Sequence, residues 1–124
     1  MKEIVIFELH FFSQELGSVS FHSEGLEVKM NLVHYSGCFT ITFNTVLCFR
    51  HTTERFTRYI SNSVDNIIKV EDSEWIDELR KTNRVTEEEI RFWKPEHYAI
   101  YLYDDGLFEF IACDVKLIQK SEGK

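Results

Sequence analysis

Alternating apolar and polar positions predict β-strands in the first part of the chain. Residues 3–12 are rich in β-branched and aromatic side chains, which predicts a strand with both faces largely covered. Residues 26–33 and 39–44 alternate with a period of two, as half-buried strands do. The Ser36-Gly37 pair is a turn signal between these two segments, so they are expected to pair antiparallel.

The neighbouring segments are less regular. Residues 13–25 carry two glycines and four serines, which predicts a loop with at most a short extended piece at residues 19–22. Residues 45–49 either continue the preceding strand past a bend or form a strand of their own. Residues 50–64 are mostly polar and predict a long connection.

Two short helical segments are expected after a short strand at residues 67–70. Ser73 is a candidate N-cap, with acidic residues after it and basic residues at the far end. The apolar face of this helix consists of Trp75, Ile76 and Leu79. Thr86 and Glu89 have the spacing of a capping box, which predicts a second helix or turn that ends before Pro95.

The last strong pattern is a β-hairpin. Residues 97–103 and 107–113 are apolar or aromatic and flank Asp104-Asp105-Gly106, and an Asp-Gly step is typical of a type I′ turn. Alternation places Tyr98, Ile100 and Leu102 on one face, and Ala99, Tyr101 and Tyr103 on the other. The chain is therefore expected to be a single α+β domain over residues 1–124, with a mostly antiparallel β-sheet and one or two short helices.

Composition supports a folded chain. Of its 124 residues, 44% are hydrophobic and 15% aromatic, which is too apolar for a disordered protein. Charged and polar residues interrupt every apolar run before it reaches the length of a signal-peptide core or a membrane span. We therefore expect a cytoplasmic protein with no membrane association. Its three cysteines, Cys38, Cys48 and Cys113, form no CxxC pair and are expected to be reduced thiols.

Motifs for catalysis and cofactor binding are missing from the sequence. The five histidines are scattered singly, and no glycine-rich phosphate-binding or nucleophile motif occurs, so we expect no cofactor and no metal, although a metal site assembled in space stays open. The Arg50/His51/Glu54 region is the one place where an acid–base pair with an anion-binding arginine could form. The alternative for this region is an ordinary ion pair at a strand end.

Charge is concentrated in one third of the chain. The formal net charge is -7, and residues 63–105 hold 6 basic and 12 acidic residues, a net charge of -6. This charge argues against nucleic-acid binding, which relies on Lys and Arg. Aromatic residues lie among the carboxylates, and such aromatics often anchor protein interfaces. The candidate binding residues for a basic protein are Asp72, Glu74, Trp75, Asp77, Glu78, Glu87, Glu88, Trp93, Tyr101, Tyr103 and Asp104.

Part of the sequence resembles a family of small bacterial proteins encoded beside toxin genes. The likeness lies in residues 43–50, Glu54, residues 73–76, residues 97–100 and residues 108–112. In outline these segments are similar to immunity proteins of contact-dependent growth inhibition and polymorphic toxin systems. The likeness spans about three-fifths of the chain, from Phe43 to Ile118.

This resemblance implies a protein that binds and neutralises a cognate toxin domain, commonly a ribonuclease or deoxyribonuclease, and it implies no catalytic motif. A nuclease presents a basic substrate cleft, which an acidic partner can occlude. Two other classes stay open. One is a small enzyme that uses the Arg50/His51/Glu54 region, and the other is a module that self-associates through an edge strand or a hairpin face. A toxin-binding protein is expected to be a monomer or weak dimer when free.

Overall fold

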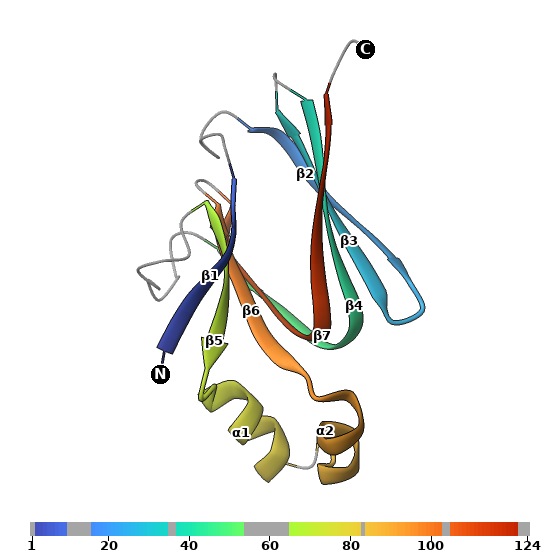
Figure 1. The fold of residues 1–124 in the computed structure, drawn as a ribbon, viewed down its shortest axis with the longest axis vertical. Coiled ribbons are helices and arrows are strands. Elements are labelled where there is room, and N and C mark those ends of the chain that lie inside the picture. Colours follow the sequence, from blue (N-terminus) through green and yellow to red (C-terminus); the bar gives the residue numbers. More distant parts are fainter. Residues whose placement is uncertain are drawn as a thin grey trace.

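The computed structural model describes residues 2–9, 16–34, 37–53, 65–82, 84–102 and 105–121. Within these ranges the chain forms one β-sheet and two short helices (Figure 1). The strands are β1 (Lys2–Glu8), β2 (Leu16–Glu24), β3 (Glu27–His34), β4 (Gly37–Thr52), β5 (Asn66–Glu71), β6 (Glu96–Leu102) and β7 (Gly106–Ser121). Helices α1 (Glu74–Lys81) and α2 (Glu87–Trp93) connect β5 to β6.

The sheet has seven strands in the order β1-β5-β6-β7-β4-β3-β2, and every neighbouring pair is antiparallel. The expected mostly antiparallel α+β architecture is thus confirmed, with a small helical part. Strands β2, β3 and β4 follow one another as a meander, and β6 and β7 form the terminal hairpin. The first and last strands of the chain, β1 and β7, both belong to the sheet.

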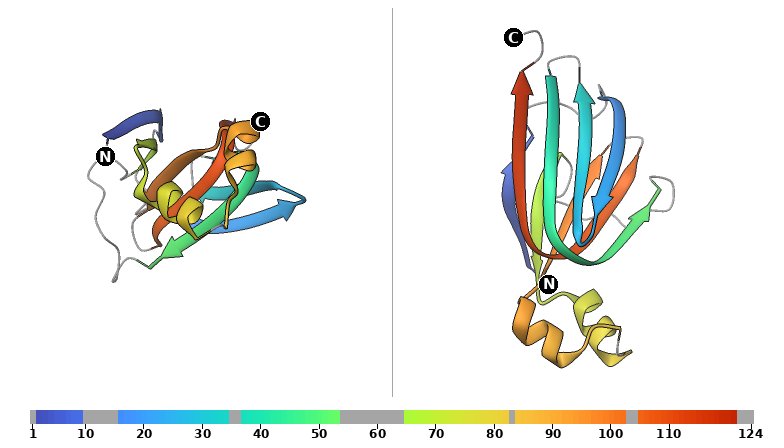
Figure 2. Two further views of the ribbon diagram at one scale, coloured as in Figure 1. Left: turned by 90° about the horizontal axis from the view of Figure 1, so that it is seen from below. Right: turned by 90° about the vertical axis from the view of Figure 1, so that its right-hand side faces the viewer.

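The sheet folds over itself at a bend in its two longest strands, β4 and β7 (Figure 2). Thr45 has a φ of 53°, and the β4–β7 register shifts by one residue between Val46 and Cys48, which marks a β-bulge. Residues 45–49 therefore continue the preceding strand past a bend, one of the two alternatives that the sequence left open. The bend brings β2 over the far part of the sheet, where the Phe21 and Phe108 rings lie 5.4 Å apart.

The main hydrophobic core lies inside this fold. It draws on both halves of the bent sheet, with Met30, Leu32 and Ile41 from one side and Ile100 and Leu102 from the other, all fully buried. At its centre the rings of Phe43 and Phe110 stack with centroids 3.7 Å apart. The predicted faces of the hairpin are confirmed for the described residues, since Tyr98, Ile100 and Leu102 join this core while Ala99 and Tyr101 belong to a second cluster with Ile68, Val70 and Leu107.

Three expectations about the strands need correction. Strand β1 is an outermost strand, so Val5 and Ile6 are exposed rather than covered on both faces. The segment expected to be a loop contains β2, a nine-residue strand, because pairing with β3 over its length outweighs its serine-rich composition. The terminal hairpin pairs Leu102 with Gly106, so three residues connect the strands instead of the two of a type I′ turn.

Most of the remaining predictions are confirmed. The short strand at residues 67–70 is part of β5, and both helix caps form as expected. One further expectation needs correction, because residues 50–52 belong to β4 and not to the predicted connection. Ser36 and residues 54–64, which carry the rest of the predicted turn and connection, lie outside the described residues.

Candidate functional site

Helices α1 and α2 lie together at one end of the molecule, beyond the bend of β4 and β7 (Figure 1). Helix α1 begins where the sequence predicts, because the Ser73 hydroxyl accepts a hydrogen bond from the Ile76 amide at 3.2 Å. Helix α2 begins at a complete capping box between Thr86 and Glu89. It ends at Lys94, whose φ of 50° is left-handed, directly before Pro95.

The two helices are attached to the sheet unequally. Helix α1 buries Trp75 and Leu79 in a small cluster with Val85 and Ile111. Helix α2 has no buried residue. It is held by a partly buried isoleucine and by the Cys113 thiol, which donates to the Trp93 carbonyl oxygen at 3.1 Å.

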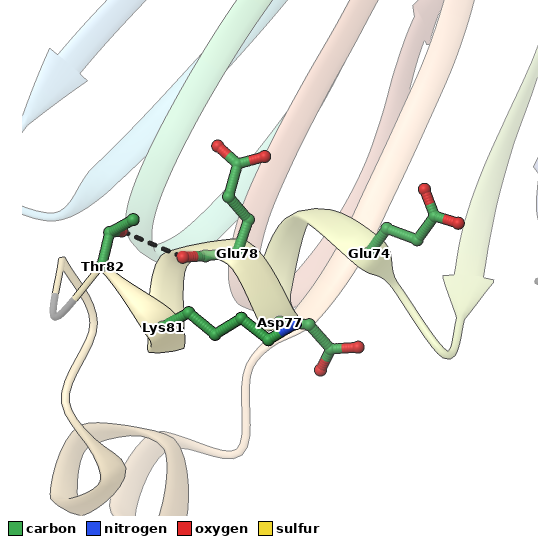
Figure 3. A pocket seen from close by; sticks show the side chains of 5 residues that line it. All are labelled: Glu74, Asp77, Glu78, Lys81 and Thr82. Carbon is green, nitrogen blue, oxygen red and sulfur yellow. Dashed lines mark hydrogen bonds between the residues drawn. The ribbon is translucent and has the colours of Figure 1, made fainter.

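The predicted acidic residues of this end are exposed. They are Asp72, Glu74, Asp77, Glu78, Glu87 and Glu88. An open depression of about 440 Å³ on α1 is lined by Glu74, Asp77, Glu78, Lys81 and Thr82 (Figure 3). The Arg80 Nε lies 2.9 Å from a Glu87 carboxylate oxygen and so joins the two helices. Within the described residues, Glu74, Glu78 and Glu88 make no ion pair, so their charge faces solvent.

The aromatic residues predicted as anchors divide between core and surface. Trp75 and Tyr101 are each only 9% exposed, so the expectation that their rings contact a partner is wrong: an anchor needs an accessible ring, and these are covered. Trp93 is exposed, and Phe92 beside it is 75% exposed, with the two rings perpendicular at 4.7 Å. Phe92 is not among the binding residues predicted from the sequence. Tyr103 and Asp104 lie outside the described residues.

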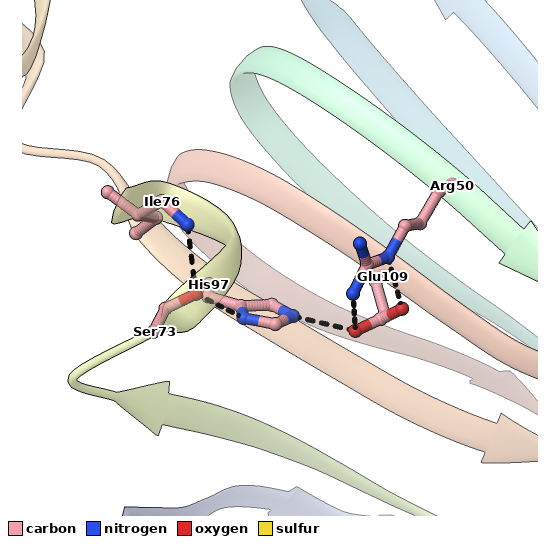
Figure 4. A network of polar contacts seen from close by, with 5 residues as sticks. All are labelled: Arg50, Ser73, Ile76, His97 and Glu109. Carbon is pink, nitrogen blue, oxygen red and sulfur yellow. Dashed lines mark hydrogen bonds and ion pairs between the residues drawn. The ribbon is translucent and has the colours of Figure 1, made fainter. Parts of the chain in front are cut away.

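A buried polar network lies where α1 meets the sheet (Figure 4). The Arg50 guanidinium donates to both Glu109 oxygens, from Nε at 2.6 Å and from NH2 at 3.1 Å. The His97 Nε2 donates to the same carboxylate at 2.9 Å, and its Nδ1 lies 2.7 Å from the Ser73 hydroxyl. Strand pairing explains part of this geometry, since Arg50 and Glu109 are direct neighbours across β4 and β7.

Trp75 completes the network from the helix side. The Arg50 guanidinium carbon lies 4.1 Å from the centre of the Trp75 ring, which is a cation–π contact. The rings of Trp75 and His97 are close to perpendicular, with centroids 5.3 Å apart. The network therefore joins the cap of α1 and its buried tryptophan to three strands of the sheet.

The electrostatics of the network favour an ionised Glu109. Burial raises the pKa of this carboxyl, but hydrogen bonds from His97 and Arg50 and their charges outweigh the burial and hold the pKa below its usual value. The carboxylate is an acceptor only, so three donors satisfy it well. The charge is therefore retained in the folded protein despite a side-chain exposure of only 4%.

Ser73, His97 and Glu109 are the residue types of a hydrolytic triad. Their positions, however, fit a role in stabilising the fold better than a role in catalysis. The Ser73 hydroxyl already accepts from the Ile76 amide as a helix cap, and all three side chains are buried. A nucleophilic serine needs access to a substrate carbonyl. In this arrangement the three side chains fix α1 on the sheet.

One feature of the sequence could have revealed the network. Glu109 interrupts an apolar run, and a buried carboxylate at that position needs a partner.

The structure separates two members of the Arg50/His51/Glu54 region. Neighbouring strand residues point to opposite faces, so Arg50 meets Glu109 and Trp75 while His51 stacks on Phe108 at 4.2 Å and hydrogen-bonds the Asp105 carbonyl oxygen. Arg50 thus forms an ion pair, as one sequence-based alternative held, but with Glu109. Glu54 lies outside the described residues.

Comparisons with known proteins identify no relative of this chain. No family model, no curated protein and no solved structure matches the chain. Among the described residues, no three His, Cys, Asp or Glu side chains are grouped so that they could hold a metal ion. Neither of the helices in the described part of the chain is long and apolar enough to cross a membrane.

Proposed function

We propose that the protein is an immunity-type inhibitor that binds a basic toxin domain, such as a nuclease, through its helical end. The observation that carries this proposal is α2, a helix that buries none of its residues and exposes Phe92 and Trp93 beside the carboxylates of both helices. An exposed aromatic pair with a charged rim is the anatomy of a protein interface. The resemblance in sequence to immunity proteins supports the same proposal.

The acidic and aromatic residues have different roles in this proposal. Unpaired carboxylates such as Glu74, Glu78 and Glu88 speed the encounter with a basic partner, and their effect falls with added salt. Trp93 and Phe92 exclude water at the centre and slow dissociation. Truncation of a central aromatic anchor to alanine should cost about 2–4 kcal/mol of binding free energy.

The direct test is co-expression with the toxin domain encoded beside this gene, scored by cell growth. Wild-type protein should rescue growth, and Trp93→Ala with Phe92→Ala should reduce rescue. Phe49→Ala, at an exposed ring on β4, is the matched control and should still rescue. The proposal is wrong if wild-type protein neither rescues the cells nor binds the purified toxin domain.

A kinetic measurement separates the two roles. Glu74→Gln/Glu78→Gln/Glu88→Gln should lower the association rate and flatten its salt dependence, whereas Glu24→Gln/Glu27→Gln on the β2–β3 hairpin should change neither. Equal effects of both sets would place the interface elsewhere on the molecule.

A further inference from the structure

The two outer edges of the sheet differ in how well they are protected. Within the described residues, β1 and β2 each have a strand neighbour on one side only over their whole length, and past the bend residues 44–52 of β4 and residues 113–121 of β7 are also paired on one side only. Natural edge strands avoid pairing with other chains through charged residues, prolines and bulges. Strand β1 carries three charged residues among its seven and has a register shift between Val5 and Phe7. It is therefore a protected edge.

Strand β2 lacks these protections over its central part. It is nine residues long, contains no proline, and its only carboxylate is Glu24 at its last position. Its one register irregularity lies at its other end, between Leu16 and Ser18. The stretch from Ser18 to His22 therefore offers an extended edge without a lysine, a carboxylate or a bulge. The inward-facing Phe21 on this edge is 42% exposed.

We propose that β2 pairs antiparallel with β2 of a second copy, so that two sheets join into one across a two-fold axis. This interface lies apart from the helical end and does not depend on the proposed toxin binding. A two-fold contact needs a surface that complements itself. Overlap of all nine residues places the axis at Ser20, and directly opposite residues then share a face of the joined sheet.

The sequence of β2 fits this register. Val19 of one copy lies opposite Phe21 of the other, so the exposed ring gains an apolar neighbour on the inner face. On the outer face, Ser18 lies opposite His22, and Ser20 lies opposite itself. No pair of like charges meets along the strand, although the chain as a whole has a net charge of -7. Two copies of an acidic chain repel each other over most of their surface, but this edge brings no like charges together. We therefore infer that the strand paired with β2 belongs to a second copy of the chain.

The outer-face position of Ser20 allows a sharp test. Ser20 is exposed, and the residues that follow it across the sheet are Asn31, Thr40 and Ile118. Ser20→Lys would place two ammonium groups opposite each other at the axis, which should weaken dimerisation about tenfold or more. Ile118→Lys adds the same charge to the same row of the same face, away from the β2 edge and in the part of β7 that pairs only with β4, and is the matched control.

Sedimentation velocity or light scattering should show wild-type protein and Ile118→Lys with twice the 14.8 kDa chain mass at high micromolar concentration. Ser20→Lys and Ser20→Glu should each dimerise about tenfold or more weakly than wild type, with unchanged circular dichroism. Mixing these two variants should restore a dimer, because unlike charges then face each other at the axis. The proposed pairing would be overturned by a monomeric wild type, by a Ser20→Lys variant that dimerises as tightly as wild type, or by a mixture that dimerises no better than either variant alone.

Discussion

Replacement of Arg50 by methionine should destabilise the protein because it leaves the Glu109 carboxylate buried without its main counter-charge. Removing one partner of a buried ion pair costs about 3–5 kcal/mol. Arg50 itself is 46% exposed, so water can reach part of the site, and we expect a loss at the low end of this range. Methionine keeps an unbranched apolar side chain at this position but removes the cation–π contact with Trp75. We therefore expect a loss of about 3 kcal/mol in the free energy of unfolding at neutral pH.

Urea unfolding followed by circular dichroism measures this loss by linear extrapolation. Arg80→Met is the matched control, because Arg80 also has its Nε 2.9 Å from a glutamate oxygen, that of Glu87, but both side chains are exposed. Loss of such a surface pair should cost no more than about 1 kcal/mol. The contrast between the two variants isolates the effect of burial on an otherwise similar pair.

A double-mutant cycle tests the reason for the loss. Glu109→Gln removes the charge that Arg50→Met leaves without its arginine partner, so the double variant should be more stable than the sum of the single losses predicts, by about 2 kcal/mol. Additive losses would show that Arg50 and Glu109 do not stabilise one another. A loss of less than about 1 kcal/mol for Arg50→Met would contradict the burial of an ionised Glu109.

Three further predictions concern pH and packing. The Glu109 carboxyl has a lowered pKa in the folded state, so its contribution to the free energy of unfolding is present above pH 4.5 and is lost as the pH falls through the folded pKa. Glu109→Gln should therefore remove this part of the acid dependence of the free energy of unfolding. Burial, with Glu96 and Asp114 nearby, raises the pKa of Tyr98 to about 12, so stability should fall between pH 10 and about 12. Tyr98→Phe should reduce this fall in alkaline unfolding experiments. Phe43→Ala should cost about 3–5 kcal/mol in urea unfolding, whereas Phe92→Ala should stay within about 0.5 kcal/mol of wild type.

Local chemistry made much of the fold predictable. Helix caps are short-range devices, so Ser73 and Thr86 could be recognised from spacing alone, and both caps form. Periodicity located β3 and the first part of β4, because an alternating pattern depends only on which face is buried. The hairpin of β6 and β7 followed from its apolar runs, although its loop length did not.

Features that depend on distant segments could not be predicted in this way. Strand β2 has a serine-rich sequence, and only pairing with β3 makes it a strand. The bend at Thr45 depends on a bulge against β7, whose sequence lies more than sixty residues away. The anchor prediction was wrong at Trp75 and Tyr101 because a list of aromatics does not tell which of them the sheet covers.

The residues that stabilise the fold lie apart from the interface proposed at the helical end. The large core lies between the halves of the bent sheet, while α1 rests on a separate small cluster and on the network around Glu109. Helix α2 contributes no buried residue, so changes to its surface cost the fold little. Its position nevertheless follows α1, because the partly buried Ile90 packs in the same small cluster as Trp75 and Leu79. The buried network therefore holds α1 on the sheet without using Phe92, Trp93 or the exposed carboxylates of the proposed interface.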